Sequence, residues 1–201
     1  MIAPVARILV LYYSSGGSVR RMAELIADGI ERVPGAEAQL RTVPRVAPVV
    51  EATEPQVPPD GAPYVELADL EQCAGLALGS PARFGNIAAP LKHFLETTTA
   101  SWQRGTLAGI PACVFTSSAS LHGGQESTLI SMMLPLLHHG MLLVGIPYTQ
   151  AELNSTREGG TPYGASHFAG LSDDLPISVA ERALCVGQGR RLAEIAIKLA
   201  T

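Results

Sequence analysis

The sequence predicts an α/β fold in which a doubly wound parallel sheet has helices on both faces. Two observations support this prediction. Short apolar runs alternate along the 201-residue chain with stretches of helical periodicity. Loops of small polar residues follow several of the apolar runs, at the strand ends where such sheets bind ligands. A hydrophobic content of 47% and a mean hydropathy of +0.22 fit a globular chain.

The first strand is expected at residues 7–13, an apolar and aromatic run without alternation, as in a central strand covered on both faces. A helix is expected next, because apolar residues recur with helical spacing at Val19, Met22, Ala23, Ile26 and Ile30. Ser18 is the expected N-cap of this helix, and Arg21 is expected to face water. Residues 14–18 form the connecting loop (SSGGS).

The loop at residues 14–18 is a candidate phosphate site. Small residues at a helix N-terminus leave backbone N–H groups free at the positive end of the helix dipole. The loop lacks the Lys of a nucleoside-triphosphate loop and the glycine spacing of a dinucleotide site, so a monophosphate suits it best. A Ser/Gly turn that binds nothing is the alternative interpretation.

Further apolar runs predict the rest of the sheet. Apolar runs predict strands at residues 73–79, 111–116 and 141–146, and alternating small or apolar residues predict a strand at 37–43. Three aperiodic segments are interpreted as surface excursions of one domain spanning 1–201, namely 44–65, 99–110 and 147–176. Five strands with intervening helices predict a flavodoxin-like sheet of order 2-1-3-4-5.

The loops after the third and fourth strands complete the predicted site. In this topology, ligands lie beyond the carboxyl ends of the strands, between the first and third strands of the chain. Residues 14–18, 80–86 and 117–124 should therefore surround one crevice. Arg83 and Phe84 suit the wall of a flat aromatic ligand, although an ordinary loop with one packed Phe would have the same composition.

Composition limits the classes of function. A net charge of −4 without a basic block argues against nucleic acid as a partner. No apolar run reaches the length of a membrane span, and no signal peptide is recognised, so a cytoplasmic protein is expected. The three cysteines lack metal-site or disulfide spacing and are expected to be buried thiols. No metal site is expected, because adjacent His138 and His139 diverge on a helix.

Six motifs in order make the chain similar to a known family. They are residues 11–14 (LYYS), 80–86 (SPARFGN), Trp102, 122–126 (HGGQE), 138–141 (HHGM) and 159–165 (GGTPYGA). Together they resemble the WrbA family of FMN-dependent NAD(P)H:quinone oxidoreductases. The resemblance spans the chain and implies bound FMN, a homotetramer and two-electron reduction of quinones by NAD(P)H.

The resemblance also implies site residues. The implied cofactor residues are Ser14, Ser15, Gly16, Gly17, Ser18, Val19, Ala82, Arg83, Phe84, Gly85, Asn86, Ser118, Ala119, Ser120, His122, Gly123, Gly124 and His139. His139 would approach the flavin ring as the candidate catalytic residue, either giving a proton to the quinone in place of water or only packing on the flavin, and Trp102 would form part of the quinone site. The chain departs from the family at 16–18, where an aromatic residue is missing, and at Ala82, where a Thr is usual.

Two alternatives from other classes remain. A flavodoxin-type electron carrier would share the FMN site but pass single electrons to protein partners, and such carriers should be more acidic than −4. A regulatory binding protein without catalysis would be colourless when purified. Trp102 itself could be a lid over the core, an interface anchor or a wall for a planar ligand.

Overall fold

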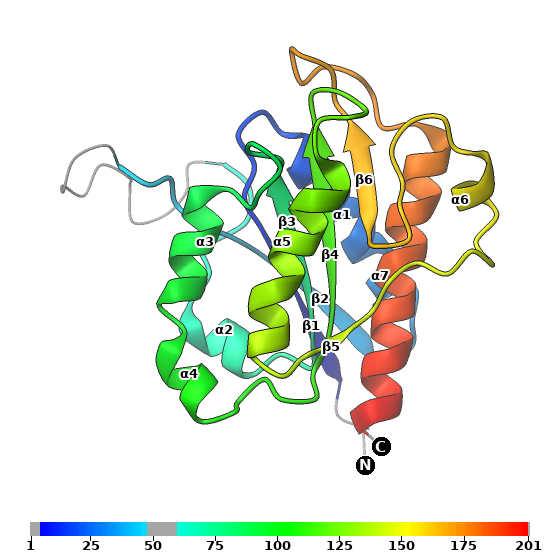
Figure 1. Ribbon diagram of the computed structural model, residues 1–201. Coiled ribbons are helices and arrows are strands. Elements are labelled where there is room, and N and C mark those ends of the chain that lie inside the picture. The colour runs from blue at the N-terminus through cyan, green and yellow to red at the C-terminus, as the bar shows by residue number, and fades with distance from the viewer. Residues whose placement is uncertain (1–4, 48–59, 201) are drawn as a thin grey trace.

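The central sheet is parallel and has six strands in the order β2-β1-β3-β4-β5, with β6 also beside β4 (Figure 1). The computed structural model describes residues 5–47 and 60–200. The strands are β1 Ala6–Tyr12, β2 Ala36–Thr42, β3 Gly75–Pro81, β4 Pro111–Ser118, β5 Leu142–Leu143 and β6 Ala165–Phe168. The predicted flavodoxin-like order is confirmed.

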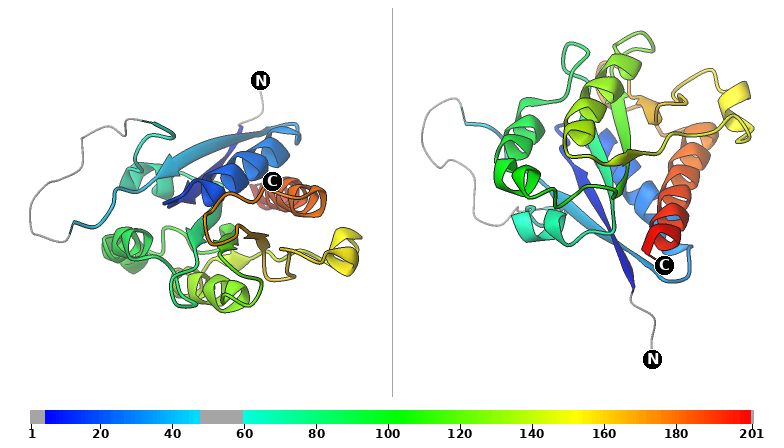
Figure 2. Two further views of the ribbon diagram at one scale, coloured as in Figure 1. Left: turned by 90° about the horizontal axis from the view of Figure 1, so that it is seen from above. Right: turned by 60° about the horizontal axis from the view of Figure 1, so that its bottom comes forward.

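Helices cover both faces of the sheet, as Figure 2 shows from above. On one face lie α1 (Ser18–Glu31) and α7 (Val179–Ala200), which pack against each other. The other face packs against α3 (Ala89–Glu96) and α5 (Gln125–His138). Three short helices are α2 (Leu67–Glu71), α4 (Thr99–Gln103) and α6 (Glu152–Ser155).

The side chains of β1 explain why its sequence shows no alternation. Ile8 and Val10 pack in the cluster beneath α1 and α7, whereas Leu9 and Leu11 pack in the cluster beneath α3 and α5. All four side chains are fully buried. A strand between two layers must be apolar on both faces, so its sequence is one continuous hydrophobic run.

The fifth strand is divided, and the prediction of five strands is wrong in this respect. β5 has only two residues and pairs with the start of β4, while β6 pairs with the end of β4. The chain between them leaves the sheet and includes α6. Gln188 of α7 fixes the returning strand, because its side chain accepts from Ala165 N at 3.0 Å and donates to Val114 O at 2.9 Å.

The other aperiodic segments also contain structure. Trp102 lies on the short helix α4 rather than in an irregular loop. Of the predicted excursion 44–65, residues 48–59 lie outside the described part of the chain. Its far end returns to the sheet at a bridge between Thr42 and Tyr64. Arg20 of α1 pairs with Asp60 at 2.6 Å and lowers the pKa of that exposed carboxyl. Across the described ranges, no helix is both long enough and apolar enough to cross a membrane.

Candidate active site

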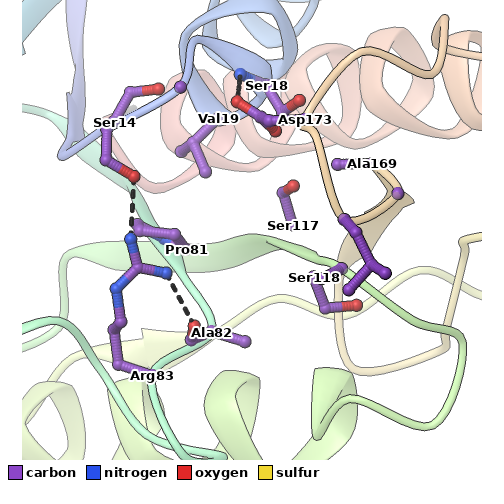
Figure 3. Close-up of a pocket in the computed structure, with 15 residues that line it drawn as sticks. Ser14, Ser18, Val19, Pro81, Ala82, Arg83, Ser117, Ser118, Ala169 and Asp173 are labelled. Atoms are coloured by element: carbon purple, nitrogen blue, oxygen red, sulfur yellow. Dashed lines mark hydrogen bonds between the residues drawn. The ribbon is translucent and has the colours of Figure 1, made fainter.

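The three predicted loops meet at the carboxyl edge of the sheet, together with the loop after β6 (Figure 3). They enclose an open cavity of about 230 Å³. Its lining consists of Ser14, Ser15, Gly16, Ser18, Val19, Pro81, Ala82, Arg83, Ser117, Ser118, Ala119, Ala169, Gly170, Leu171 and Asp173. The cavity therefore lies between the ends of β1, β3 and β4, where the strand order reverses.

The turn before α1 differs from the predicted cap. Gly17, in the left-handed region at φ 107°, is the N-cap, and Ser18 is already the first residue of the helix. Ser14 takes the capping role, because its Oγ accepts from the N–H groups of Gly17 at 3.1 Å and Arg20 at 3.4 Å. Only glycine adopts such a backbone angle without strain, so position 17 is a structural requirement of the turn.

Three backbone N–H groups at this turn remain available for a ligand. Those of Ser15, Gly16 and Val19 have no hydrogen-bond partner within the described residues. They lie at the positive end of the α1 dipole, beside the hydroxyls of Ser14 and Ser15. This donor set fits a phosphate group, which accepts several short hydrogen bonds and carries negative charge.

Arg83 connects the first two loops. Its guanidinium donates to Ser15 Oγ at 2.7 Å and to its own loop at Ala82 O. Arg83 and Asn86 exchange backbone hydrogen bonds at 3.0 Å, which closes a tight turn. At the tip of this turn, Phe84 is fully exposed and has a left-handed backbone at φ 52°. An exposed aromatic ring held in a strained conformation is typical of a contact surface for a ligand.

The third loop is shaped by its own hydrogen bonds. Ser118 Oγ donates to Ser120 O at 2.7 Å and accepts from Gln125 Nε2 at 2.9 Å. Gly85 and Gly124 hold the second and third loops together, because a Cβ at 124 would lie 2.8 Å from Gly85 Cα. Several predicted cofactor residues lie in these two loops but do not line the cavity: Phe84, Gly85, Asn86, Ser120, His122, Gly123 and Gly124.

Trp102 and His139 lie apart from this cavity. α4 and the C-terminal end of α5 are at the opposite edge of the sheet (Figure 1). There the two residues share a second cavity of about 360 Å³. Trp102 is 48% exposed, and its Nε1 donates to His138 O at 2.8 Å. Within one chain, neither side chain lies beside the candidate phosphate loop at residues 14–18.

His139 is a neutral imidazole with one free nitrogen. Thr98 Oγ1 donates to Leu95 O at 2.7 Å, so its contact with His139 Nε2 at 2.9 Å requires the imidazole to donate. His139 Nδ1 is then a buried acceptor without a partner in the described structure. Burial, together with the neighbouring His138, lowers the pKa of His139.

Sequence reasoning missed Asp173, a charged residue that lines the cavity, and the contacts of Arg21 with two lining residues. Asp173 lines the cavity from the loop after β6, which belongs to the segment 147–176 interpreted as a surface excursion. Arg21 was expected to face water, yet its Nη2 donates to Ser18 Oγ at 2.6 Å and reaches Asp173 O at 3.5 Å. Helical periodicity places Arg21 on the polar side of its helix but does not identify its partners. No local pattern in residues 169–173 indicates that Asp173 lies beside α1.

Comparison with known proteins gives full-length relatives. A chain from Geobacter sulfurreducens named NAD(P)H dehydrogenase (quinone) is 43% identical over 199 residues, covering 96% of this chain and 98% of the relative. A chain of the same name from Geotalea uraniireducens is 41% identical, covering 96% and 99% respectively.

Solved structures share the fold. A WrbA-like flavodoxin from Agrobacterium tumefaciens aligns with a TM-score of 0.68 at 23% identity, covering 96% of this chain and 98% of that one. Flavodoxin 1 from Bacillus cereus aligns with a TM-score of 0.57 at 16% identity, covering 94% and 97%. The family model for NADPH-dependent FMN reductase matches residues 6–152. The chain therefore belongs to the NADPH-dependent FMN reductase family.

Proposed function

We propose that this protein is an NAD(P)H:quinone oxidoreductase that uses FMN. The observation that carries the proposal is the cavity at the strand-order reversal, which is lined near the start of α1 by three residues whose backbone N–H groups have no partner in the described structure. The full-length relatives named NAD(P)H dehydrogenase (quinone) support the reaction class. The flavin supplies the hydride chemistry when it is bound.

The residues of the site divide into two groups in this proposal. Residues 14–19 hold the FMN phosphate through backbone N–H groups and hydroxyls. Residues 82–86 and 118–124 form the walls for the isoalloxazine and ribityl parts, with Phe84 offering an aromatic face and Arg83 a positive charge. Nicotinamide and quinone then use the same open side of the cavity in turn, and backbone N–H groups there stabilise negative charge on the ring.

Within the family, we propose that the chain belongs to the WrbA group. The six motifs quoted from the sequence support this assignment, because they occur in order from the first strand to the segment before β6. Loops that contain these motifs line the cavity at residues 14 and 81–83.

We also propose a homotetramer in which Trp102 and His139 serve the cavity of another subunit. Their position supports this proposal, since within one chain they line a different cavity from the proposed cofactor loops. Ile130, Leu134 and Leu137 form an exposed apolar row on α5 and offer a surface for assembly.

We infer a reducing compartment such as the cytoplasm. All three cysteines are buried free thiols. Burial raises the pKa of Cys73 and of Cys113 to about 12, so both stay protonated and inert. Buried, unpaired thiols are typical of proteins that function where disulfides do not form.

The test begins with the colour of the purified protein. We expect flavin absorbance, its loss when NADH is added without oxygen, and its return with benzoquinone. A flavodoxin-type carrier would instead be reduced only slowly by NADH, and a regulatory protein would be colourless. Either of these results would contradict the proposed reaction.

The phosphate assignment is tested by Gly17→Glu. The new carboxylate would lie beside the free N–H groups and repel the phosphate, so FMN binding measured by fluorescence quenching should be lost. Gly35→Glu is the matched control, because Gly35 also has a left-handed backbone, at φ 87°, but lies before β2. FMN affinity that is equal in both variants would show that the phosphate binds elsewhere.

A further inference from the structure

A carboxylate of the chain itself lies where a phosphate at α1 would sit. Asp173 Oδ2 accepts from Ser18 N at 3.4 Å, and Figure 3 shows this carboxylate at the N-terminal end of α1. The approach depends on Gly16, because a Cβ at that position would overlap the carboxyl group. The carboxylate of Asp173 therefore depends on two features of the turn: the Ser18 N–H group that it accepts from, and the absence of a side chain at Gly16.

The segment that carries Asp173 is attached by few contacts. Asp173 itself has a left-handed backbone, at φ 56°, which is unusual for a residue other than glycine. Asp173 N donates to Gly170 O at 3.2 Å within the same loop. Its remaining contacts to α1 are the long bonds from Ser18 N and Arg21 Nη2, at 3.4 and 3.5 Å. Leu171 is 95% exposed, so little packing opposes movement of the loop.

A carboxylate and a phosphate cannot share this place. Both are anions that are stabilised by the N–H groups and the dipole of a helix N-terminus, and they repel each other at short range. A phosphate at the free N–H groups of residues 15, 16 and 19 would lie against the bond between Asp173 and Ser18.

We propose that Asp173 is an internal anion that occupies the phosphate position of the free protein and that FMN must displace. Asp173 thereby stabilises the start of α1 before the cofactor binds and lowers the affinity for the cofactor. The inference rests on the proposed function, because it takes the phosphate of FMN as the incoming anion. Arg21, which holds both Ser18 Oγ and the loop carbonyl, stays beside the phosphate after the exchange.

The test compares Asp173→Asn with Asp174→Asn, both on protein freed of flavin. Asp174 is exposed, and its carboxylate makes no contact with the N-terminus of α1 in the described structure. For Asp173→Asn we expect the Kd of FMN to fall roughly threefold to tenfold, because the competing charge is lost. The Kd of riboflavin, which lacks the phosphate, should stay unchanged.

A second readout needs no flavin. Asp173→Asn should lower the Tm of the free protein, because α1 loses a negative charge at its positive end. Inorganic phosphate should then raise the Tm of Asp173→Asn more than that of the wild type. Asp174→Asn should match the wild type in every measurement. The expected pattern is thus a less stable free protein that binds phosphate compounds more tightly.

Three results would overturn the inference while leaving the cofactor assignment intact. They are an unchanged or weaker FMN affinity in Asp173→Asn, an equal gain in riboflavin affinity, and an equal gain in Asp174→Asn. Failure of FMN to bind any of the proteins would overturn the proposed function and this inference together. These outcomes are distinguishable because the titration of the wild type is measured first.

Discussion

At the scale of single residues, Glu181 is the most densely bonded buried charge in the described chain. It is 2% exposed and accepts from the N–H groups of Gly159, Phe168 and Ser178. Its Oε2 also lies 3.0 Å from His167 Nδ1. Burial raises the pKa of Glu181, but hydrogen bonds from His167 and from backbone N–H groups outweigh this and lower it to about 2.

Replacing Glu181 with Gln should destabilise the protein by about 2 to 3 kcal/mol at pH 7. The folded pKa of about 2 is below the ordinary 4.5, so the stabilisation is present above pH 4.5 and is lost as pH falls toward 2. Urea unfolding at pH 7, 5 and 3 should therefore show a gap between wild type and variant that narrows with acid. Glu194→Gln, which breaks only a surface pair with Arg190, is the control. A gap that does not depend on pH would contradict the assignment.

At the scale of elements, two glycines set the contact between α1 and α7. A Cβ at Gly189 would overlap the carbonyl oxygen of Ile26, and one at Gly29 would overlap that of Val186. The two helices therefore approach with their backbones in contact, which no larger residue allows. This contact fixes the position of α1, whose N-terminus follows the candidate phosphate loop at residues 14–18.

Gly189→Ala tests the helix contact against helix propensity. Ala should stabilise an isolated helix by about 1 kcal/mol, but overlap with a backbone atom should cost about 1 to 3 kcal/mol or more, since the backbone cannot turn aside. We expect a net loss in thermal unfolding. In the control Gly187→Ala, only the flexible side chain of Gln150 must move, so stability should change by less than about 1 kcal/mol. A more stable Gly189→Ala protein would show that the helices do not approach this closely.

At the scale of the whole molecule, the residues at the carboxyl ends of the strands differ in chemistry from those at the opposite ends. The carboxyl edge holds the cavity with serines, free N–H groups and charges. The opposite edge holds Trp102, the neutral His139 and a second cavity, next to the apolar row on α5. A single chain therefore separates the two sets of residues that the WrbA resemblance assigns to one reaction site.

Assembly should bring these edges together, and Leu134→Glu tests this expectation. A charge in the exposed apolar row should block association, so the mass by light scattering and the quinone turnover should fall together, while FMN affinity stays unchanged. The control is Val179→Glu, which places the same charge on another exposed apolar residue, at the start of α7, and should leave the mass and the quinone turnover unchanged. A wild-type protein that is a monomer with full turnover would contradict the shared site.

Local sequence patterns determined much of the fold and part of the site. The apolar runs identify β1, β3 and β4, because a strand buried on both faces is apolar throughout, and helical spacing identifies α1. The loops at residues 14–18, 80–86 and 117–124 could be placed together, because the ends of parallel strands meet at one edge. These inferences need only neighbouring residues and the rules of parallel sheets.

Only the tertiary structure decided the remaining features. The division of the fifth strand depends on the pairing of β6 with β4 and on the hydrogen bond from Ala165 N to Gln188, which lies in α7 in the helical layer. Asp173 meets Ser18 across 155 positions of sequence, and Trp102 and His139 line one cavity that lies apart from the loops of the proposed cofactor site. Periodicity reports which face of an element is buried, but not which distant segment covers it. Contacts between segments distant in sequence therefore appear only when the whole chain has folded.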